Sequence, residues 1–110
     1  MNIKEEHLNV ARNMRIIETM KNSLLSNVAG LYEDMMQQVN TGSKVDVCER
    51  FSDIVLTSYL LGKQLGVGYN VLDKRIESKL RLCLLEEETE SFFNNGLIEL
   101  SEHFKNRRRE

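Results

Sequence analysis

None of the 110 residues is proline, and this absence constrains the fold more than any other feature of the sequence. Proline breaks a helix interior because it lacks a backbone N–H and clashes with the preceding turn. A chain without proline that contains many Leu, Met, Glu and Lys residues can form long helices without a forced break. Apolar side chains recur mainly at spacings of three and four residues along the chain, so we expect no strand. The sequence therefore predicts an all-α protein.

An apolar stripe at helical spacing runs along the first forty residues. It consists of Val10, Met14, Ile17, Leu24, Val28, Leu31 and Met35. Asn22 and Ser23 lie at a gap in this stripe, and either residue could cap a second helix. We therefore predict two helices, at about residues 5–20 and 23–39, with one bent helix as the alternative.

The clearest turn is the sequence NTGS at residues 40–43. Ser43 is a suitable N-cap for a third helix at about residues 44–65, and Gly66 is a suitable residue to end it. The core stripe that we predict for this helix consists of Cys48, Phe51, Val55, Ser58, Leu61 or Gly62, and Leu65.

Two further helices complete the expected fold, at about residues 69–86 and 97–107. The stripe of the first consists of Tyr69, Leu72, Ile76, Leu80 and Cys83. The sequence NNG at residues 94–96 predicts a break before the second. We expect a single domain over residues 1–110, built as a bundle of four to five helices, with its core helices at about residues 10–85.

Apolar residues exceed what one small bundle can bury. The surplus includes Leu60, Leu61, Leu82, Leu84 and Leu85. A two-fold interface through the third and fourth helices would cover this surface. The sequence therefore predicts a homodimer.

The charge balance argues against a nucleic-acid-binding protein, because 15 Lys and Arg residues face 17 Asp and Glu residues. The basic run at residues 105–110 is typical of a solvated helix end, with a partner contact as the alternative. Cys48 and Cys83 lie far apart without CxxC spacing, which favours buried free thiols. No apolar segment approaches the length of a membrane span or a signal core, so we expect a cytoplasmic protein.

Residues 49–81, ERFSDIVLTSYLLGKQLGVGYNVLDKRIESKLR, resemble the MazG-like family, a group of short bacterial relatives of the all-α nucleoside triphosphate pyrophosphohydrolases. The likeness covers about residues 10–85, and its strongest elements are DIVLTSYLLGKQLGV and LDKRIESKLR. Active relatives bind Mg²⁺ through two acidic motifs on adjacent helices, ExxE and ExxD. Such carboxylates suit Mg²⁺ because this hard cation prefers oxygen ligands and holds substrate phosphates.

On this chain the first motif begins at Asp34 and ends at Gln37, and the second begins at Arg50 and ends at Asp53. Asp34 and Asp53 keep a carboxylate. Gln37 offers only a neutral carbonyl oxygen, and Arg50 is a permanent cation that repels a metal ion. The resemblance leaves open whether the chain is an enzyme, because two of four ligand positions are not acidic.

Two more acids precede these motif positions and could replace the lost ligands if the register shifted. The candidate metal ligands are Asp34, Asp53, Glu33 and Glu49, with Mg²⁺ as the implied ion and no other cofactor. We assign no catalytic residue, since no pairing of a nucleophile with a general base is evident.

Three interpretations of ERFSD at residues 49–53 remain open. In the first, Arg50 pairs with Asp46 and Asp53 on an ordinary solvated helix face. In the second, Arg50 replaces the metal of a relic active site and pairs with Asp34 and Asp53 across the bundle. In the third, the four acids form a working metal site.

The sequence thus supports two hypotheses about function. The first is a MazG-like nucleotide pyrophosphohydrolase relative whose degraded acidic site has weak or no activity. The second is a non-enzymatic dimeric helical protein that binds a protein partner or a nucleotide signal.

Overall fold

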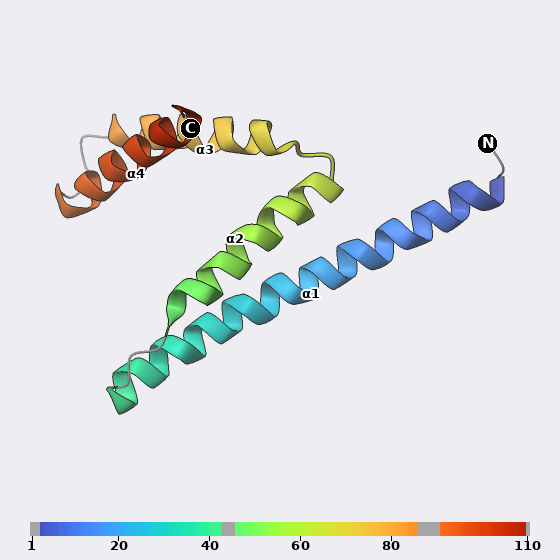
Figure 1. Cartoon of the computed structure of the whole chain (residues 1–110), viewed down its shortest axis with the longest axis horizontal. Helices are drawn as coiled ribbons and strands as arrows, with labels where there is room; N and C mark the ends of the chain where they lie inside the picture. Colours follow the sequence, from blue (N-terminus) through green and yellow to red (C-terminus); the bar gives the residue numbers. More distant parts are fainter. Residues whose placement is uncertain (1–2, 43–45, 86–90, 110) are drawn as a thin grey trace. The chain divides into compact units, whose positions relative to one another are not determined.

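The computed structural model describes residues 3–42, 46–85 and 91–109, which form four α-helices and contain no strand (Figure 1). The predicted all-α fold is therefore confirmed. Contacts between residues group the chain into two compact units, residues 1–68 and residues 69–110. The expectation of a single domain stays a prediction.

Helix α1 is continuous from Ile3 to Thr41, so the predicted break at residues 21–23 is wrong. The side chains there bond along the helix, and none of them caps a new one. The Lys21 ammonium lies 2.9 Å from the Glu18 carboxylate, and the Asn27 amide donates to the Ser23 hydroxyl at 3.5 Å. Asn and Ser cost a helix interior only a few tenths of a kcal/mol, less than ending the helix between two packed segments would cost.

Helix α2 runs from Val47 to Gln64 and begins at an acidic cap. The Asp46 carboxylate accepts a hydrogen bond from the backbone N–H of Cys48 at 3.0 Å. This bond satisfies one of the free N–H groups at the helix start. The predicted cap, Ser43, lies outside the described residues.

The end of α2 has the hydrogen-bond pattern of a Schellman motif. The N–H of Gly66 donates to the Lys63 carbonyl at 3.1 Å, and the N–H of Val67 donates to the Gly62 carbonyl at 2.8 Å. Gly66 has a φ of +91°, a conformation that residues with a Cβ rarely adopt. The prediction that Gly66 ends this helix is confirmed.

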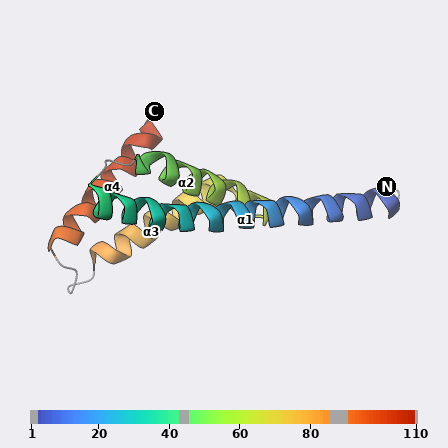
Figure 2. The same ribbon diagram turned by 90° about the horizontal axis from the view of Figure 1, so that it is seen from below.

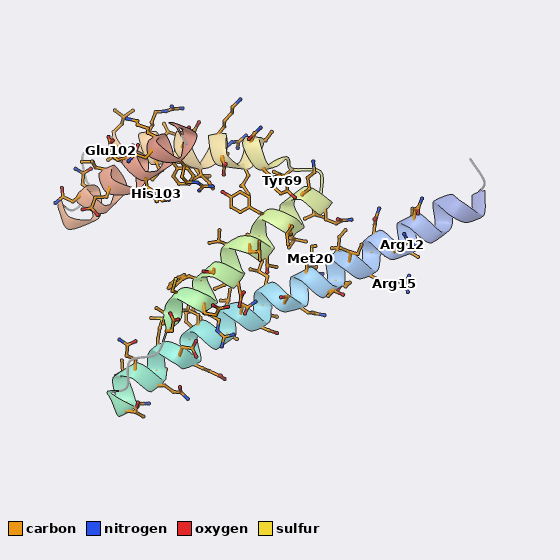
Figure 3. All side chains as sticks on the ribbon, in the orientation of Figure 1. Arg12, Arg15, Met20, Tyr69, Glu102 and His103 are labelled. Carbon is orange, nitrogen blue, oxygen red and sulfur yellow. The ribbon has the colours of Figure 1, made fainter. Side chains whose placement is uncertain are left out.

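Helices α1 and α2 lie side by side and antiparallel, as both views of the ribbon show (Figures 1 and 2). Near one end the Gln64 amide donates to the Asn13 amide oxygen at 3.1 Å. Near the other end Arg50 meets Asp34. Met20, which lies between Asn13 and Asp34 along α1, is half-buried and is labelled in Figure 3. The first turns of α1 extend past the end of α2 (Figure 1).

The stripe that the sequence predicts as the core of α2 is wrong for much of its length. Phe51 and Val55 are 50% and 53% exposed, and Leu65 is exposed as well. Ser58, Leu61 and Gly62 of this stripe are half-buried. Arg50 and Ile54 are half-buried as well, although the predicted stripe does not include them. The side of α2 that meets α1 carries the polar residues Arg50 and Gln64, so the most apolar face of the helix is not the one that packs on α1.

Both cysteines are free thiols, as predicted. Cys83 is half-buried, but Cys48 is exposed on the same side of α2 as Phe51. The prediction that Cys48 is buried is therefore wrong for the same reason as the stripe.

Helices α3, Tyr69–Leu84, and α4, Ser91–Arg109, pack together in the second unit. The best-buried apolar side chains among the described residues are here, with Leu80 at 6% and Phe104 at 9% exposure. Leu80 belongs to the stripe that the sequence predicts for α3.

The break predicted at residues 94–96 is wrong, because these residues are helical within α4. Gly96 costs the helix about 1 kcal/mol relative to Ala, but packing of Leu97 and Phe104 on the same helix outweighs it. The predicted fraying at residues 86–90 lies outside the described residues. No helix in the described part of the chain is long and apolar enough to cross a membrane.

Candidate functional site

Asp34 and Arg50, one from each predicted acidic motif, meet where α1 and α2 face each other. The Arg50 Nε donates to the Asp34 Oδ2 at 3.2 Å. The Arg50 Nη1 donates to the Asn27 Oδ1, also at 3.2 Å. Two side chains of α1 therefore hold one guanidinium of α2.

Gly30 provides the space in which this guanidinium lies. It is buried between Asn27 and Asp34, and a Cβ added to it would overlap the guanidinium carbon of Arg50 and lie 2.7 Å from both terminal nitrogens. Asn27, Gly30 and Asp34 are spaced at three and four residues, so they occupy one face of α1. We call these three residues with Arg50 the arginine site.

Sequence analysis missed Asn27 and Gly30. A usable signal was present, since a glycine inside a long helix is costly and often marks a close approach by another group. Asn27 and Asp34, at i−3 and i+4 from that glycine, are the polar residues that such a group would meet. The group that approaches Gly30 is the guanidinium of Arg50, the cation at a motif position where an acid is expected.

The charges of the arginine site are partly shielded from water. The Arg50 and Asp34 side chains are 33% and 20% exposed. A fully exposed ion pair contributes about 0–1 kcal/mol, and breaking a buried one costs about 3–5 kcal/mol. The loss of either partner here should therefore cost about 1–3 kcal/mol, between those limits.

The pairs that the first interpretation of ERFSD expects are not formed within the described residues. The Asp46 carboxylate caps the start of α2, and the ion pair of Arg50 is made with Asp34. Asp53 is half-buried, and none of the described residues makes a hydrogen bond or ion pair with its carboxylate. The ion pair with Asp34 that the second interpretation expects is therefore present. The ion pair with Asp53 is not formed within the described residues.

The other candidate ligands point away from the arginine site. Glu33 and Glu49 are exposed, and each lies about 100° around its helix from the motif residue that follows it. Gln37 is exposed as well. The described residues contain no group of three or more His, Cys, Asp or Glu side chains arranged to hold a metal. A site built from Asp34, Asp53, Glu33 and Glu49 stays a prediction.

A small cavity of about 200 Å³ opens between α3 and α4. Asp73, Lys74, Glu77 and Arg107 line it, so both signs of charge are present. Asp73 and Glu77 already have interaction partners, and the Arg107 guanidinium lies 5.3 Å from the centre of the Phe104 ring. We therefore place no functional site here.

The arginine site lies within the part of the chain that matches a known family. The model of the MazG-like family matches residues 10–95, which include α2, α3 and most of α1. No curated protein and no solved structure matches the chain. A match over more than half of the chain establishes the relationship: this chain belongs to the MazG-like family.

Proposed function

We propose that this protein is a nucleotide pyrophosphohydrolase relative in which Mg²⁺-dependent catalysis is weak or absent. The observation that supports this proposal is the ion pair between Arg50 and Asp34 over Gly30. Arg50 stands at a motif position where active relatives are expected to hold a metal-binding acid. Its guanidinium forms an ion pair with Asp34, which is one of the two motif carboxylates that remain.

The charge of Arg50 acts directly against metal binding. Two like unit charges about 4 Å apart repel by about 4 kcal/mol at an effective dielectric constant of about 20. This energy corresponds to about a thousandfold loss of affinity for each unit of metal charge. Because a guanidinium stays protonated at any working pH, this repulsion cannot be relieved by deprotonation.

Enzyme assays test this proposal. Wild-type protein incubated with each common nucleoside triphosphate and Mg²⁺ should release no pyrophosphate above the rate without enzyme. The double variant Q37E/R50E restores acids at both altered positions and should gain a measurable Mg²⁺-dependent rate. The single variant Q37E, which keeps Arg50, is the matched control and should stay inactive. Robust turnover by the wild type would contradict the proposal.

The non-enzymatic alternative has its own supporting observation, which is the exposed apolar surface of the first unit. On α1, Leu25 and Tyr32 are 69% and 65% exposed, and Met36 lies close to them on the same side. Clustered exposed apolar residues mark interaction surfaces in proteins. A protein partner would be detected as a heat of binding by calorimetry, and a nucleotide signal as metal-independent binding of a nucleoside triphosphate.

A further inference from the structure

A shallow groove of about 290 Å³ runs along the first half of α1. It is lined by residues of α1, and these are Arg12, Arg15, Ile16, Thr19 and Met20. The last four follow Arg12 by three, four, seven and eight residues, so all of them share one face of the helix. Figure 3 labels Arg12, Arg15 and Met20 on this part of α1. We call this surface the α1 groove.

The two arginines of the α1 groove are exposed cations, and neither has a hydrogen-bond or ion-pair partner in the described part of the chain. Lys21, which is exposed on the same helix, instead pairs with Glu18 at 2.9 Å. Arg12 and Arg15 are three residues apart, so their side chains are neighbours on the helix surface. A guanidinium has five N–H donors and binds a carboxylate through two parallel hydrogen bonds. The groove therefore presents two neighbouring cations that suit carboxylates.

Charge in the first unit is divided between its two ends. Residues 9–24 of α1 contain three bases and one acid, and residues 57–66 at the end of α2 contain one base and no acid. Residues 25–42 and 46–56 together contain five acids and one base. Because α1 and α2 are antiparallel, the two base-rich segments lie side by side (Figure 1). Glu5 and Glu6 precede Arg12 by about 9–11 Å along the helix. The α1 groove therefore lies at the base-rich end of this unit.

The rest of the α1 groove is largely apolar. Ile16 and Met20 are half-buried, so packing in the fold leaves part of each side chain in contact with the groove. A methionine side chain adapts its shape to different apolar partners. From Arg12 to Met20 the groove spans about 12 Å of helix. An apolar strip with cations at one end complements one face of an acidic amphipathic helix.

The shape and charge of the groove favour a helix over other anionic ligands. Small-molecule sites are concave and enclose most of the ligand surface, whereas this groove is shallow and lies on a single helix. Binding to a nucleic-acid backbone rests on many phosphate contacts, and the groove offers two cations. A helix from another protein can lie along the groove and meet both the arginines and the apolar strip.

We propose that the α1 groove binds an acidic amphipathic helix of a partner protein. Carboxylates one turn apart on that helix pair with Arg12 and Arg15, and an apolar side chain of the same face packs against Ile16 and Met20. The charge pattern of the partner complements the two arginines, which gives the contact its specificity. The α1 groove does not include Arg50, so the proposal does not depend on whether catalysis survives.

Fluorescence anisotropy with a synthetic helix tests the proposal on the full chain. The probe is an alanine-based, fluorescein-labelled peptide of about 20 residues, since shorter peptides form little helix in water. Leu and Glu residues at spacings of three and four form one face of this peptide. Wild-type protein should bind it with a dissociation constant of about 100 μM or tighter. Peptides with Gln in place of each Glu, or Ala in place of each Leu, should bind at least about tenfold more weakly.

Single charge reversals locate the binding surface. R12E and R15E should each raise the dissociation constant about tenfold, because each replaces an exposed attraction with a repulsion of similar size. K21E is the matched control, since it reverses a cation of the same helix that lies outside the groove. At physiological salt, which screens distant charges, K21E should change the dissociation constant less than about twofold. All three positions are exposed, and circular dichroism should show wild-type helical content in each variant.

Two other probes distinguish the class of partner. An oligothymidylate of about 20 nucleotides and vesicles that contain phosphatidylserine should both bind more weakly than the acidic peptide. Equal or tighter binding of either probe would overturn the proposal. Failure of wild-type protein to bind the peptide, undiminished binding of the Gln peptide, or an equal loss in R15E and K21E would overturn it as well.

Discussion

Within each of the two units of this chain, the helices are held together by a different kind of contact. In the α3–α4 unit, Leu80 and Phe104 are buried apolar side chains. In the α1–α2 unit, α2 has no buried residue, and the most specific contact is the polar one between Arg50 and Asp34 over Gly30. The α3–α4 pair relies on the burial of apolar side chains. The α1–α2 pair combines half-buried side chains with the directional ion pair between Arg50 and Asp34.

The two kinds of contact set the alignment of the packed helices in different ways. Apolar side chains repeat every three or four residues along a helix, so a stripe alone tolerates more than one alignment. The guanidinium of Arg50 has fixed donor directions, and it fits only where Asn27, Gly30 and Asp34 occur together. We infer that the arginine site fixes which side of α2 meets α1.

Removal of the buried ring in the second unit should have the largest effect. Phe104→Ala should lower the free energy of unfolding by about 3–4 kcal/mol, because a large buried side chain is lost and a cavity remains. Urea denaturation followed by circular dichroism measures this loss. Ile98→Ala, at a 45% exposed position of the same helix, should cost less than about 1 kcal/mol. Similar losses at both positions would refute an apolar core around Phe104.

A methyl group at Gly30 should act through Arg50. Gly→Ala inside a helix normally stabilises by about 1 kcal/mol, and Gly96→Ala, with no neighbour within 4 Å of the new Cβ, should do so. Gly30→Ala displaces the guanidinium and should be about 2 kcal/mol less favourable than the Gly96 change. In an Arg50→Ala background, Gly30→Ala should become stabilising. Equal effects of Gly30→Ala in the two backgrounds would show that Arg50 does not lie over Gly30.

The partly buried ion pair should contribute more than an exposed one. Asp34→Ala should cost about 1.5 kcal/mol, because it leaves the Arg50 cation half-buried without its carboxylate. Glu18→Ala breaks the exposed pair with Lys21 at the surface of α1 and should cost only a few tenths of a kcal/mol. Chemical denaturation of both variants gives the comparison, and equal costs would argue against the arginine site.

The smallest effect concerns the cap at the start of α2. Asp46→Ala should cost about 1 kcal/mol, since the N–H of Cys48 loses its acceptor. Asp46→Asn keeps a side-chain oxygen and should retain most of the stability. Thermal unfolding measures both variants. A loss as large for Asn as for Ala would show that charge, and not the cap hydrogen bond, matters at this position.

The elements of the fold were largely predictable, because local chemistry decides them. The absence of proline and the apolar spacing predicted an all-α chain, and Gly66 predicted the end of α2. The errors at residues 21–23 and 94–96 have one cause. Asn, Ser and Gly disfavour a helix interior only weakly, so packing of the flanking residues decided the outcome, and packing is not visible in a local pattern.

The arginine site was predictable in part. Sequence comparison placed Asp34 and Arg50 at facing motif positions, and their ion pair is present. Asn27 and Gly30 were missed because their roles depend on the alignment of two helices. The side of α2 that meets α1 was also not predictable, since it carries the polar residues Arg50 and Gln64 and is not the most apolar face of the helix.

We propose that the cation of Arg50 takes the place of a metal ion, and calorimetric titration with Mg²⁺ tests this proposal. Wild-type protein should give no binding heat up to millimolar Mg²⁺, and Q37E should behave in the same way. Q37E/R50E should bind Mg²⁺ measurably, because it adds two carboxylates and removes the repelling charge. Tight Mg²⁺ binding by the wild type, or none by the double variant while it stays folded, would contradict the claim.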